Sequence, residues 1–214
     1  MNDKIVVLLS CVLLISAALP ACSPSTQLAP AATTAAPEPS LAAAQPSNSE
    51  QTQSDPDQEG TNMTFQLKSS AFSHGEPIPR VYSCDGENVS PPLTWTDPPA
   101  GSEALVLIMD DPDAPSGDFV HWVLYGLPAE AGSMPQAVAA EENRQDGSRQ
   151  GNNGRGQIGY TGPCPPGGTH RYFFHLYAVD NQINLAAGEA KQAVLQHIDG
   201  HVVATAELMG TFSR

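Results

Sequence analysis

Three aspartates interrupt an apolar stretch of the chain, and a histidine follows where the apolar pattern resumes. They lie in MDDPDAPSGDFVHWVLY, residues 109–125, as Asp110, Asp111, Asp113 and His121. A proline fixes its own φ and restricts the residue before it, so carboxylates among prolines are held in a rigid turn. Rigid carboxylates can orient a histidine, bind a metal ion or pair with an arginine. The alternative is an ordinary solvated turn.

A second group of candidate residues surrounds a loop rich in glycine and proline. The loop GYTGPCPPGG, residues 159–168, can present unpaired backbone N–H groups to an anion, because glycine permits a close approach. Side chains alternate between faces in the strand that follows, so His170 and Tyr172 share one face and Arg171 lies on the other. Arg171 is the only Lys or Arg in this largely apolar strand, so we expect it to pair with an acid.

Short apolar runs separated by Pro, Gly, Asn and Asp predict a domain made mostly of β-strands. The run 104–109 is apolar throughout, which is typical of a central strand buried on both faces. Alternation along the later run places His121 on the same face as Val123 and Tyr125. We expect strands over residues 64–67, 93–96, 104–109, 119–125, 171–179 and 202–212.

One helix is expected, and one long segment has little periodicity. An apolar stripe over residues 188–198 has helical spacing, and Gly200 is well placed just beyond its end. Residues 126–163 contain many glycines and no clear pattern, so we interpret them as a loop. A loop of that length inside a compact domain is usually functional or mobile.

The N-terminal region has the composition of an export signal followed by a tether. Residues 1–21 combine Lys4 with an apolar run, as in a secretory signal peptide, and Cys22 stands where a bacterial lipoprotein carries its lipid. An ordinary signal peptide with an incidental cysteine is the alternative. Residues 22–61 are rich in Ala, Pro, Ser, Thr and Gln, a composition that predicts a disordered linker. We therefore expect one folded domain over residues 62–214, exported and anchored to a membrane of the bacterial cell envelope.

Charge and cysteine usage narrow the functional classes. Residues 62–214 carry 8 Lys and Arg against 17 Asp and Glu, a net charge of −9. Nucleic acids bind to basic protein surfaces, so we exclude them as partners of this acidic domain. An anionic ligand would need a pocket with local positive charge. An exported compartment permits a disulfide between Cys84 and Cys164, and two buried thiols are the alternative.

Four stretches of the sequence resemble the phosphatidylethanolamine-binding protein family, specifically its bacterial and archaeal branch, the Raf-kinase-inhibitor-like proteins. They are CDGENVSPPLTW, DPDAPSGDFVHW, GPCPPGGTHRYFFHLYA and GHVVATAELMGTF, and together they cover essentially all of residues 62–214. The resemblance implies a mainly β fold: an antiparallel β-sandwich with Greek-key connections, one or two short peripheral helices and a shallow pocket for phosphate-like anions. Carried over residue by residue, the ligand-binding pocket would contain Asp111, Pro115, His121, Gly162, Cys164, His170 and Tyr172. Asp110 precedes the motif and is expected outside the pocket.

Three features depart from the family pattern. Bacterial relatives tend to carry an aromatic residue in the glycine loop where this chain has Arg155, so a basic contact could replace an aromatic one at the pocket rim. The spacing between Pro166 and His170 is shorter than in the mammalian branch. The chain ends soon after Phe212, and we expect the C-terminal lid of the mammalian proteins to be missing.

The resemblance and the residue chemistry together suggest roles for the charged groups. Asp111 would hold a histidine in a donating orientation, while His121 and His170 would supply most of the local positive charge. Asp113 and Arg171 would form a buried structural pair, whose disruption on one side typically costs about 3–5 kcal/mol.

The expected function is non-enzymatic binding of a small anionic or phosphate-bearing ligand, of the phospholipid head group type, with a regulatory or inhibitory role. No cofactor and no metal are expected. A hydrolase using Asp111 with His121 or His170 is an alternative, but no GxSxG motif occurs and Cys164 has no evident activating partner. A metal site built from Asp111, Asp113 and a histidine is another. A third is a protein-interaction module that inhibits an envelope protease, since an exported protein would not meet a cytoplasmic kinase. The oligomeric state is left open.

Overall fold

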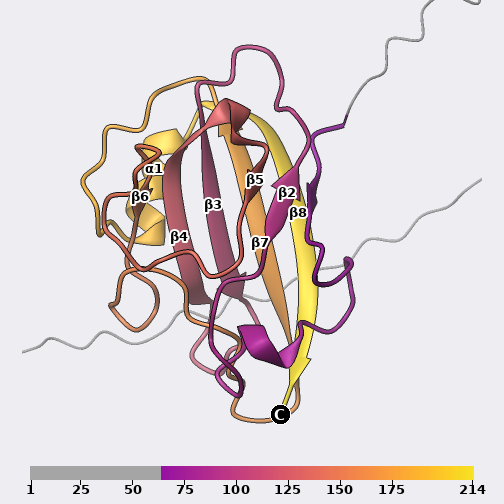
Figure 1. Cartoon of the computed structure of the whole chain (residues 1–214). Coiled ribbons are helices and arrows are strands. Elements are labelled where there is room, and N and C mark those ends of the chain that lie inside the picture. Colours follow the sequence, from indigo (N-terminus) through magenta and orange to yellow (C-terminus); the bar gives the residue numbers. More distant parts are fainter. Residues whose placement is uncertain (1–63) are drawn as a thin grey trace, which may run out of the picture. The chain divides into compact units, whose positions relative to one another are not determined.

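The computed structural model describes residues 64–214, and the predicted signal peptide, Cys22 and the linker lie outside that range. The described residues form two antiparallel sheets with one α-helix (Figure 1), the mainly β architecture that the sequence predicts. The three-stranded sheet has the order β1-β2-β5, with β1 (Leu67–Lys68), β2 (Leu93–Trp95) and β5 (Ser133–Met134). The five-stranded sheet has the order β6-β4-β3-β7-β8, with β3 (Ala104–Asp111), β4 (Phe119–Pro128), β6 (Arg149–Gln150), β7 (Thr169–Val179) and β8 (Val202–Ser213). The helical segments are the 3-10 turns η1 (Arg80–Tyr82) and η2 (Ala129–Ala131), and the α-helix α1 (Lys191–Ile198).

Strand β3 is the centre of the fold, and every one of its residues is buried, as predicted for a strand covered on both faces. One face contributes Leu105, Leu107 and Met109 to the main core, which also contains apolar residues of the three-stranded sheet. The other face contributes to a second core that includes Val194 and Ile198 of α1. Full burial of one such aliphatic side chain stabilises a fold by about 1.5–3 kcal/mol, so the buried residues of β3 contribute strongly to the stability of both cores.

Helix α1 is shorter at its start than the sequence predicts. Gly188 has a positive φ of 86° and Ala190 is extended, so the helix begins at Lys191 rather than at residue 188. Its end is as predicted, because Gly200 follows it with a positive φ of 77°.

Residues 126–163 are not one loop, and that prediction is wrong. They contain the end of β4, η2 and two strands of two residues each, which are too short to produce a readable periodicity. A buried side chain organises part of this segment: Gln150 accepts the indole N–H of Trp122 at 2.8 Å and donates to the carbonyls of Ala139 and Glu141 at 2.7 and 2.9 Å. Such long-range polar contacts cannot be read from local sequence.

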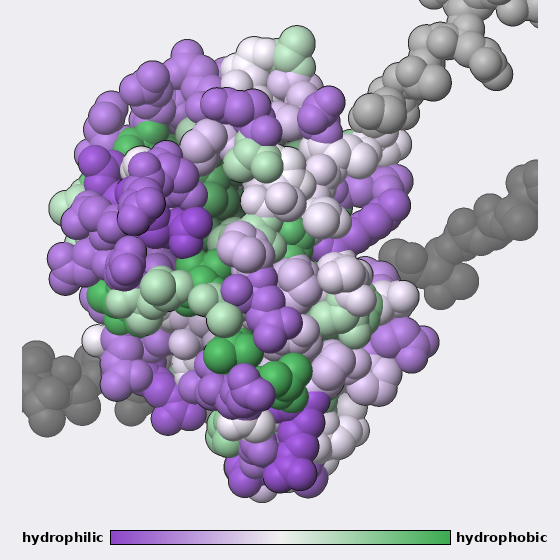
Figure 2. All heavy atoms as spheres, viewed as in Figure 1, coloured by the Kyte–Doolittle hydropathy of each residue, from purple (hydrophilic) through white to green (hydrophobic). Residues whose placement is uncertain are grey.

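The face shown in Figure 2 combines hydrophilic residues, residues of intermediate hydropathy and smaller hydrophobic patches. Among the described residues, Val202 and Val203 are the only exposed large hydrophobic side chains. Residues 64–214 contain no helix with the length and hydropathy needed to cross a membrane.

A disulfide joins Cys84 and Cys164, with their Cα atoms 5.4 Å apart. It connects the segment after η1 to the proline-rich loop before β7, and the backbone N–H of Cys84 also donates to the carbonyl of Pro163 at 3.0 Å. The predicted bond is therefore confirmed, and two buried thiols are not found. The link spans a sequence separation of 80 residues, so it restricts the unfolded chain strongly.

We expect no free thiol in the folded domain of the exported protein. A thiol count on denatured, unreduced protein tests this, because a disulfide survives denaturation without reductant. Replacing both cysteines by serine should lower the free energy of unfolding by about 2–5 kcal/mol, measured by denaturant titration. Two reactive thiols from Cys84 and Cys164 would contradict the bond.

Candidate functional site

A pocket of about 150 Å³ lies at one end of the five-stranded sheet. Strand β3 ends there, β4 and β7 begin there, and the C-terminus lies at the same end (Figure 1). The antiparallel register places Asp111 opposite Phe119, which brings the aspartate-rich turn beside the start of β4. The lining comprises Asp111, Ala114, Pro115, Ser116, Phe119, His121, Arg155, Cys164, Pro165, Pro166 and His170.

Most of the residues predicted to bind a ligand converge on this pocket. Five of the seven line it, namely Asp111, Pro115, His121, Cys164 and His170. Tyr172 lies against them and is fully buried, with its ring centroid 5.2 Å from that of His121 and 6.5 Å from that of His170. Their ligand-binding role remains a prediction.

A β-bulge turns His121 towards the pocket. The register of β3 with β4 shifts between Met109 and Asp110, which leaves His121 as an extra residue in β4. A bulge re-aims the side chain that it carries. The prediction that His121 shares a face with Val123 and Tyr125 is therefore wrong. Those two belong to the core beneath α1, whereas the His121 ring packs against the pocket side of β7.

The carboxylate of Asp111 holds His170 in place. Its Oδ2 lies 2.7 Å from Nδ1 of His170, and its Oδ1 accepts the backbone N–H of Asp113 at 2.9 Å. Both side chains of the pair are buried, with exposed fractions of 5% for Asp111 and 9% for His170. The predicted contact between Asp111 and a histidine is thus confirmed, and the same carboxylate also closes the turn.

His121 is held by a backbone carbonyl rather than by a carboxylate. Its Nδ1 donates to the carbonyl oxygen of Thr161 at 2.6 Å. Burial lowers the pKa of His121, and this effect outweighs the Thr161 bond and the Asp111 carboxylate, which both raise it. His121 is therefore neutral at pH 7, and the expectation that it supplies positive charge is wrong.

One donor beside the pocket has no acceptor in the described part of the chain. The hydroxyl of Tyr172 is buried without a hydrogen bond. Burial and then the Asp111 carboxylate raise its pKa, while the N–H of Cys164 lowers it, so the hydroxyl keeps its proton. Cys164 lies between Pro163 and Pro165, which have no N–H, and its own N–H faces the oxygen of this hydroxyl. Unpaired buried donors are rare and indicate where a ligand or water binds.

Gly162 does not line the pocket, and its predicted role needs correction. Its N–H donates to Oδ1 of Asn88 at 2.7 Å, so it is not available to an anion. A Cβ at Gly162 would lie 2.2 Å from the carbonyl oxygen of Tyr82. The glycine is required because the loop packs directly on the segment around η1.

Arg155 provides the permanent positive charge of the pocket. Its Nε donates to Oγ1 of Thr161 at 3.2 Å, and no carboxylate of the described residues forms an ion pair with it. An aromatic side chain does line the pocket, but it is Phe119 of β4 and not a residue of the glycine loop. The Phe119 ring lies edge-on to the His121 ring, with the ring centroids 4.9 Å apart. A Cβ at Gly154 would lie 2.7 Å from the Phe119 ring, so the loop carrying Arg155 rests on this aromatic side chain. The position of Phe119 at the start of a strand after DPDAPSG was the available sequence signal.

Asp113 and Arg171 form the predicted pair, but the pair is not buried. Nε and Nη2 of Arg171 donate to the two carboxylate oxygens at 2.9 and 2.7 Å, and its backbone N–H donates at 3.0 Å. The side chains are exposed by 53% for Arg171 and 30% for Asp113, because this face of β7 is open to solvent. These hydrogen bonds lower the pKa of Asp113 to about 2. The resulting stabilisation is present above the ordinary aspartate pKa and is lost as pH falls towards about 2, and solvent exposure keeps it small.

Asp110 lies outside the pocket, as predicted. It points to the opposite face of the sheet, where Nζ of Lys191 donates to it at 2.6 Å and Nε2 of His175 lies 3.4 Å away. Lys191 also donates to Asp118 at 2.5 Å. Burial raises the pKa of Asp110, but hydrogen bonds from His175 and Lys191 outweigh this effect and lower the pKa. The carboxylate is therefore committed to a structural network.

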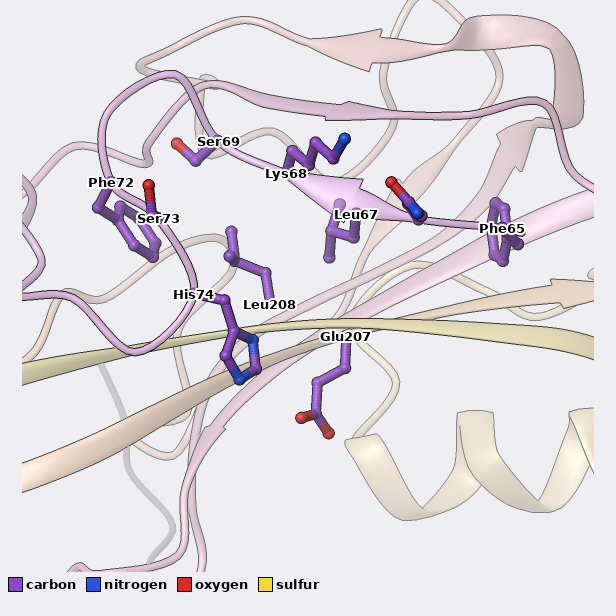
Figure 3. Close-up of a pocket in the computed structure, with 10 residues that line it drawn as sticks. Phe65, Leu67, Lys68, Ser69, Phe72, Ser73, His74, Glu207 and Leu208 are labelled. Carbon is purple, nitrogen blue, oxygen red and sulfur yellow. The ribbon is translucent and has the colours of Figure 1, made fainter. Parts of the chain in front are cut away.

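A larger hollow of about 400 Å³ lies between β1 and β8 (Figure 3). Leu67 and Leu208 point towards one another from the two strands, whereas Glu207 points away from the space between them. None of the predicted ligand-binding residues lines this hollow. A binding site needs polar groups that converge, so we place the candidate site in the smaller pocket beside His170.

Comparison with known proteins agrees with this architecture. Residues 68–213 match the family model described as phosphatidylethanolamine-binding protein. A UPF0098 protein of Methanothermobacter thermautotrophicus is 47% identical over 148 residues, which cover 69% of this chain and 98% of the relative. The crystal structure of a protein described as a phosphatidylethanolamine-binding protein homologue from Chlamydia trachomatis matches with a TM-score of 0.65 and 42% identity, over 71% of this chain and 98% of that chain. Escherichia coli YbcL, described as a member of the mammalian PEBP family, matches with a TM-score of 0.65 and 29% identity, over 70% and 98%.

The two aspartates should differ in their effect on stability. We expect Asp111→Ala to lower the melting temperature more than Asp113→Ala, the reverse of what a buried Asp113–Arg171 pair implies. Asp111→Ala leaves the buried Nδ1 of His170 and the Asp113 amide without an acceptor, at about 1–3 kcal/mol for each buried group. Asp113→Ala removes an exposed pair, which contributes little. Thermal unfolding of both variants measures the difference, and a larger loss for Asp113→Ala would contradict the greater structural role assigned to Asp111.

Proposed function

We propose that this chain, which belongs to the phosphatidylethanolamine-binding protein family, binds a small phosphate-bearing ligand in this pocket without catalysing a reaction. Family membership supports a ligand-binding protein at a general level. The observation that carries the more specific proposal is the convergence of hydrogen-bonding groups on a cavity of about 150 Å³. These groups are the rings of His121 and His170 and the guanidinium of Arg155, with the hydroxyl of Tyr172 buried beside them.

Electrostatics favour an anion at this place despite the acidic domain. A net charge of −9 over residues 62–214 opposes the approach of an anion through solvent. Arg155 is the only Lys or Arg that lines the pocket, and no carboxylate of the described residues neutralises it. A guanidinium binds phosphate oxygens in a planar, two-point geometry. We therefore assign to Arg155 most of the charge attraction for the ligand.

The pocket chemistry supports binding rather than catalysis. A nucleophile needs a base within hydrogen-bond reach. The sulfur of Cys164 is used in the disulfide, and Ser116, the remaining hydroxyl of the lining, has no hydrogen bond to a histidine or carboxylate within residues 64–214. The carboxylate of Asp113 is engaged by Arg171, and the described residues contain no group of three or more His, Cys, Asp or Glu that could hold a metal ion.

We further propose that the domain is exported and held at a membrane of the cell envelope by lipid on Cys22. The support is the sequence of residues 1–22, which lies outside the described residues. Replacing Cys22 by serine should abolish incorporation of labelled fatty acid and release the protein from the membrane fraction. Membrane recovery unchanged by this substitution would contradict the anchor.

Calorimetric titration with phosphorylethanolamine tests the binding proposal. We expect affinity to rise as the pH falls from about 8 to about 6, because an ordinary histidine gains its proton near about 6.5 and a charge-assisted bond is stronger than a neutral one. His170→Ala should weaken binding by about tenfold or more, the value of a hydrogen bond to a charged group, and should flatten the pH dependence. Arg155→Gln should weaken binding over the whole pH range.

Two matched substitutions control for general effects of charge and of histidine removal. His201→Ala removes a half-exposed histidine that pairs with Asp180, and Lys68→Gln removes one positive charge beside the other hollow. Both should bind phosphorylethanolamine as the parent does. Binding that ignores pH and tolerates the loss of both His170 and Arg155 would mean that the ligand does not occupy this pocket.

A further inference from the structure

We infer that the pocket selects an anion that brings its own proton, and that it therefore prefers hydrogen phosphate to sulfate. The inference rests on the proposed function, because it assumes that an oxyanion enters the space between His121, His170 and Arg155. The new element is the protonation state of the ligand that the site recognises. It follows from the hydrogen bonds that the two histidine Nδ1 atoms already make within the protein.

The acceptors on the two histidines decide which nitrogen carries the proton. Nδ1 of His121 faces the carbonyl oxygen of Thr161 at 2.6 Å, and a carbonyl can only accept. Nδ1 of His170 faces Oδ2 of Asp111 at 2.7 Å, and the other oxygen of this carboxylate already accepts an N–H, that of Asp113. Each Nδ1 is therefore a donor, so a neutral ring has its lone pair on Nε2.

These two lone pairs are left for the ligand. Both rings line the pocket, and neither Nε2 has a hydrogen-bond partner in the described part of the chain. The remaining titratable and charged groups near the rings are Asp110, Asp111, Asp113, Arg155 and Tyr172. Of these, Asp110 is bound by Lys191, Asp113 by Arg171 and Asp111 by His170, so no carboxylate is free to displace the ligand. Separately, burial lowers the pKa of His121, which keeps that ring an acceptor at neutral pH.

The pocket thus presents donors and acceptors together. The guanidinium of Arg155 donates, whereas the two Nε2 atoms accept. Sulfate has only acceptor oxygens, so at least one of them would face a lone pair. Hydrogen phosphate has the same charge and the same tetrahedral shape, but it carries one O–H that can donate to Nε2. A site with buried polar groups discriminates strongly against a ligand that leaves one of them unpaired.

The experiment compares inorganic phosphate with sulfate on the full chain at about pH 8, where ordinary histidines are neutral, and at about pH 5.5, where they are protonated. At the higher pH we expect phosphate to bind roughly tenfold more tightly or better, from the cost of one unpaired buried group. At the lower pH the gap should shrink, because a protonated ring nitrogen donates to either anion and because phosphate, then mostly dihydrogen phosphate, carries one negative charge fewer than sulfate. Titration in buffers of different ionisation enthalpy should also show proton uptake on sulfate binding at the higher pH.

One variant and two further ligands test whether the preference for phosphate over sulfate arises from the ligand's own proton. At about pH 8, Arg155→Gln should weaken both anions by a similar factor and leave their ratio unchanged, because hydrogen phosphate and sulfate each carry two negative charges. Dimethyl phosphate, which has neither O–H nor N–H and carries one negative charge, should bind no more tightly than sulfate. Phosphorylethanolamine offers ammonium protons, so its affinity relative to inorganic phosphate distinguishes a lipid head group from free phosphate as the source of the ligand.

The outcomes separate this inference from the function on which it rests. Equal affinity for phosphate and sulfate at the higher pH, or tighter binding of sulfate, would overturn proton selection while leaving anion binding intact. Failure of both anions and of phosphorylethanolamine to bind at either pH would reject the proposed function and the inference together.

Discussion

The hydrogen bond between the Asp111 carboxylate and Nδ1 of His170 holds the pocket together. It ties the end of β3 to the start of β7, and the same carboxylate closes the turn by accepting the amide of Asp113. A buried charge is tolerated only when it is paired and hydrogen-bonded, so this end of the sheet must keep both contacts. The orientation of the His170 ring, and with it the hydrogen-bonding character of the pocket, follows from that requirement.

The end of β3 serves both faces of the sheet because consecutive side chains alternate. Asp111 points to the pocket, while Asp110 points to the opposite face and binds Lys191, at the start of the helix that covers the second core. The bulge in β4 interrupts the same alternation and moves His121 to the pocket face. One regular strand and one irregular strand are therefore both needed to bring two imidazoles together.

The loop before β7 is held by contacts from a distant part of the chain. The disulfide joins Cys164 to Cys84, the amide of Gly162 binds Asn88, and Tyr160 donates to the carbonyl of Tyr82 at 2.7 Å. Prolines on either side of Cys164 further restrict the backbone of this stretch. A loop fixed in this way has little conformational freedom to lose when a ligand binds, which favours affinity and a defined geometry.

Local sequence patterns were sufficient for much of this description. Apolar runs and turn residues located the long strands, and helical spacing located α1. Five residues of the pocket lining were identified by the resemblance to a known family rather than by local patterns. The pairing of Asp113 with Arg171 and the disulfide were also predictable from residue types. Contacts between distant segments decided the rest. The register of β3 with β4 determines which face carries His121. The Asp113–Arg171 pair lies on a face that is open to solvent. The amide of Gly162 donates to Asn88, so it is not available to the pocket. Alternation and turn chemistry depend on neighbours in the chain, whereas register, desolvation and hydrogen-bond partners depend on which segments meet in space.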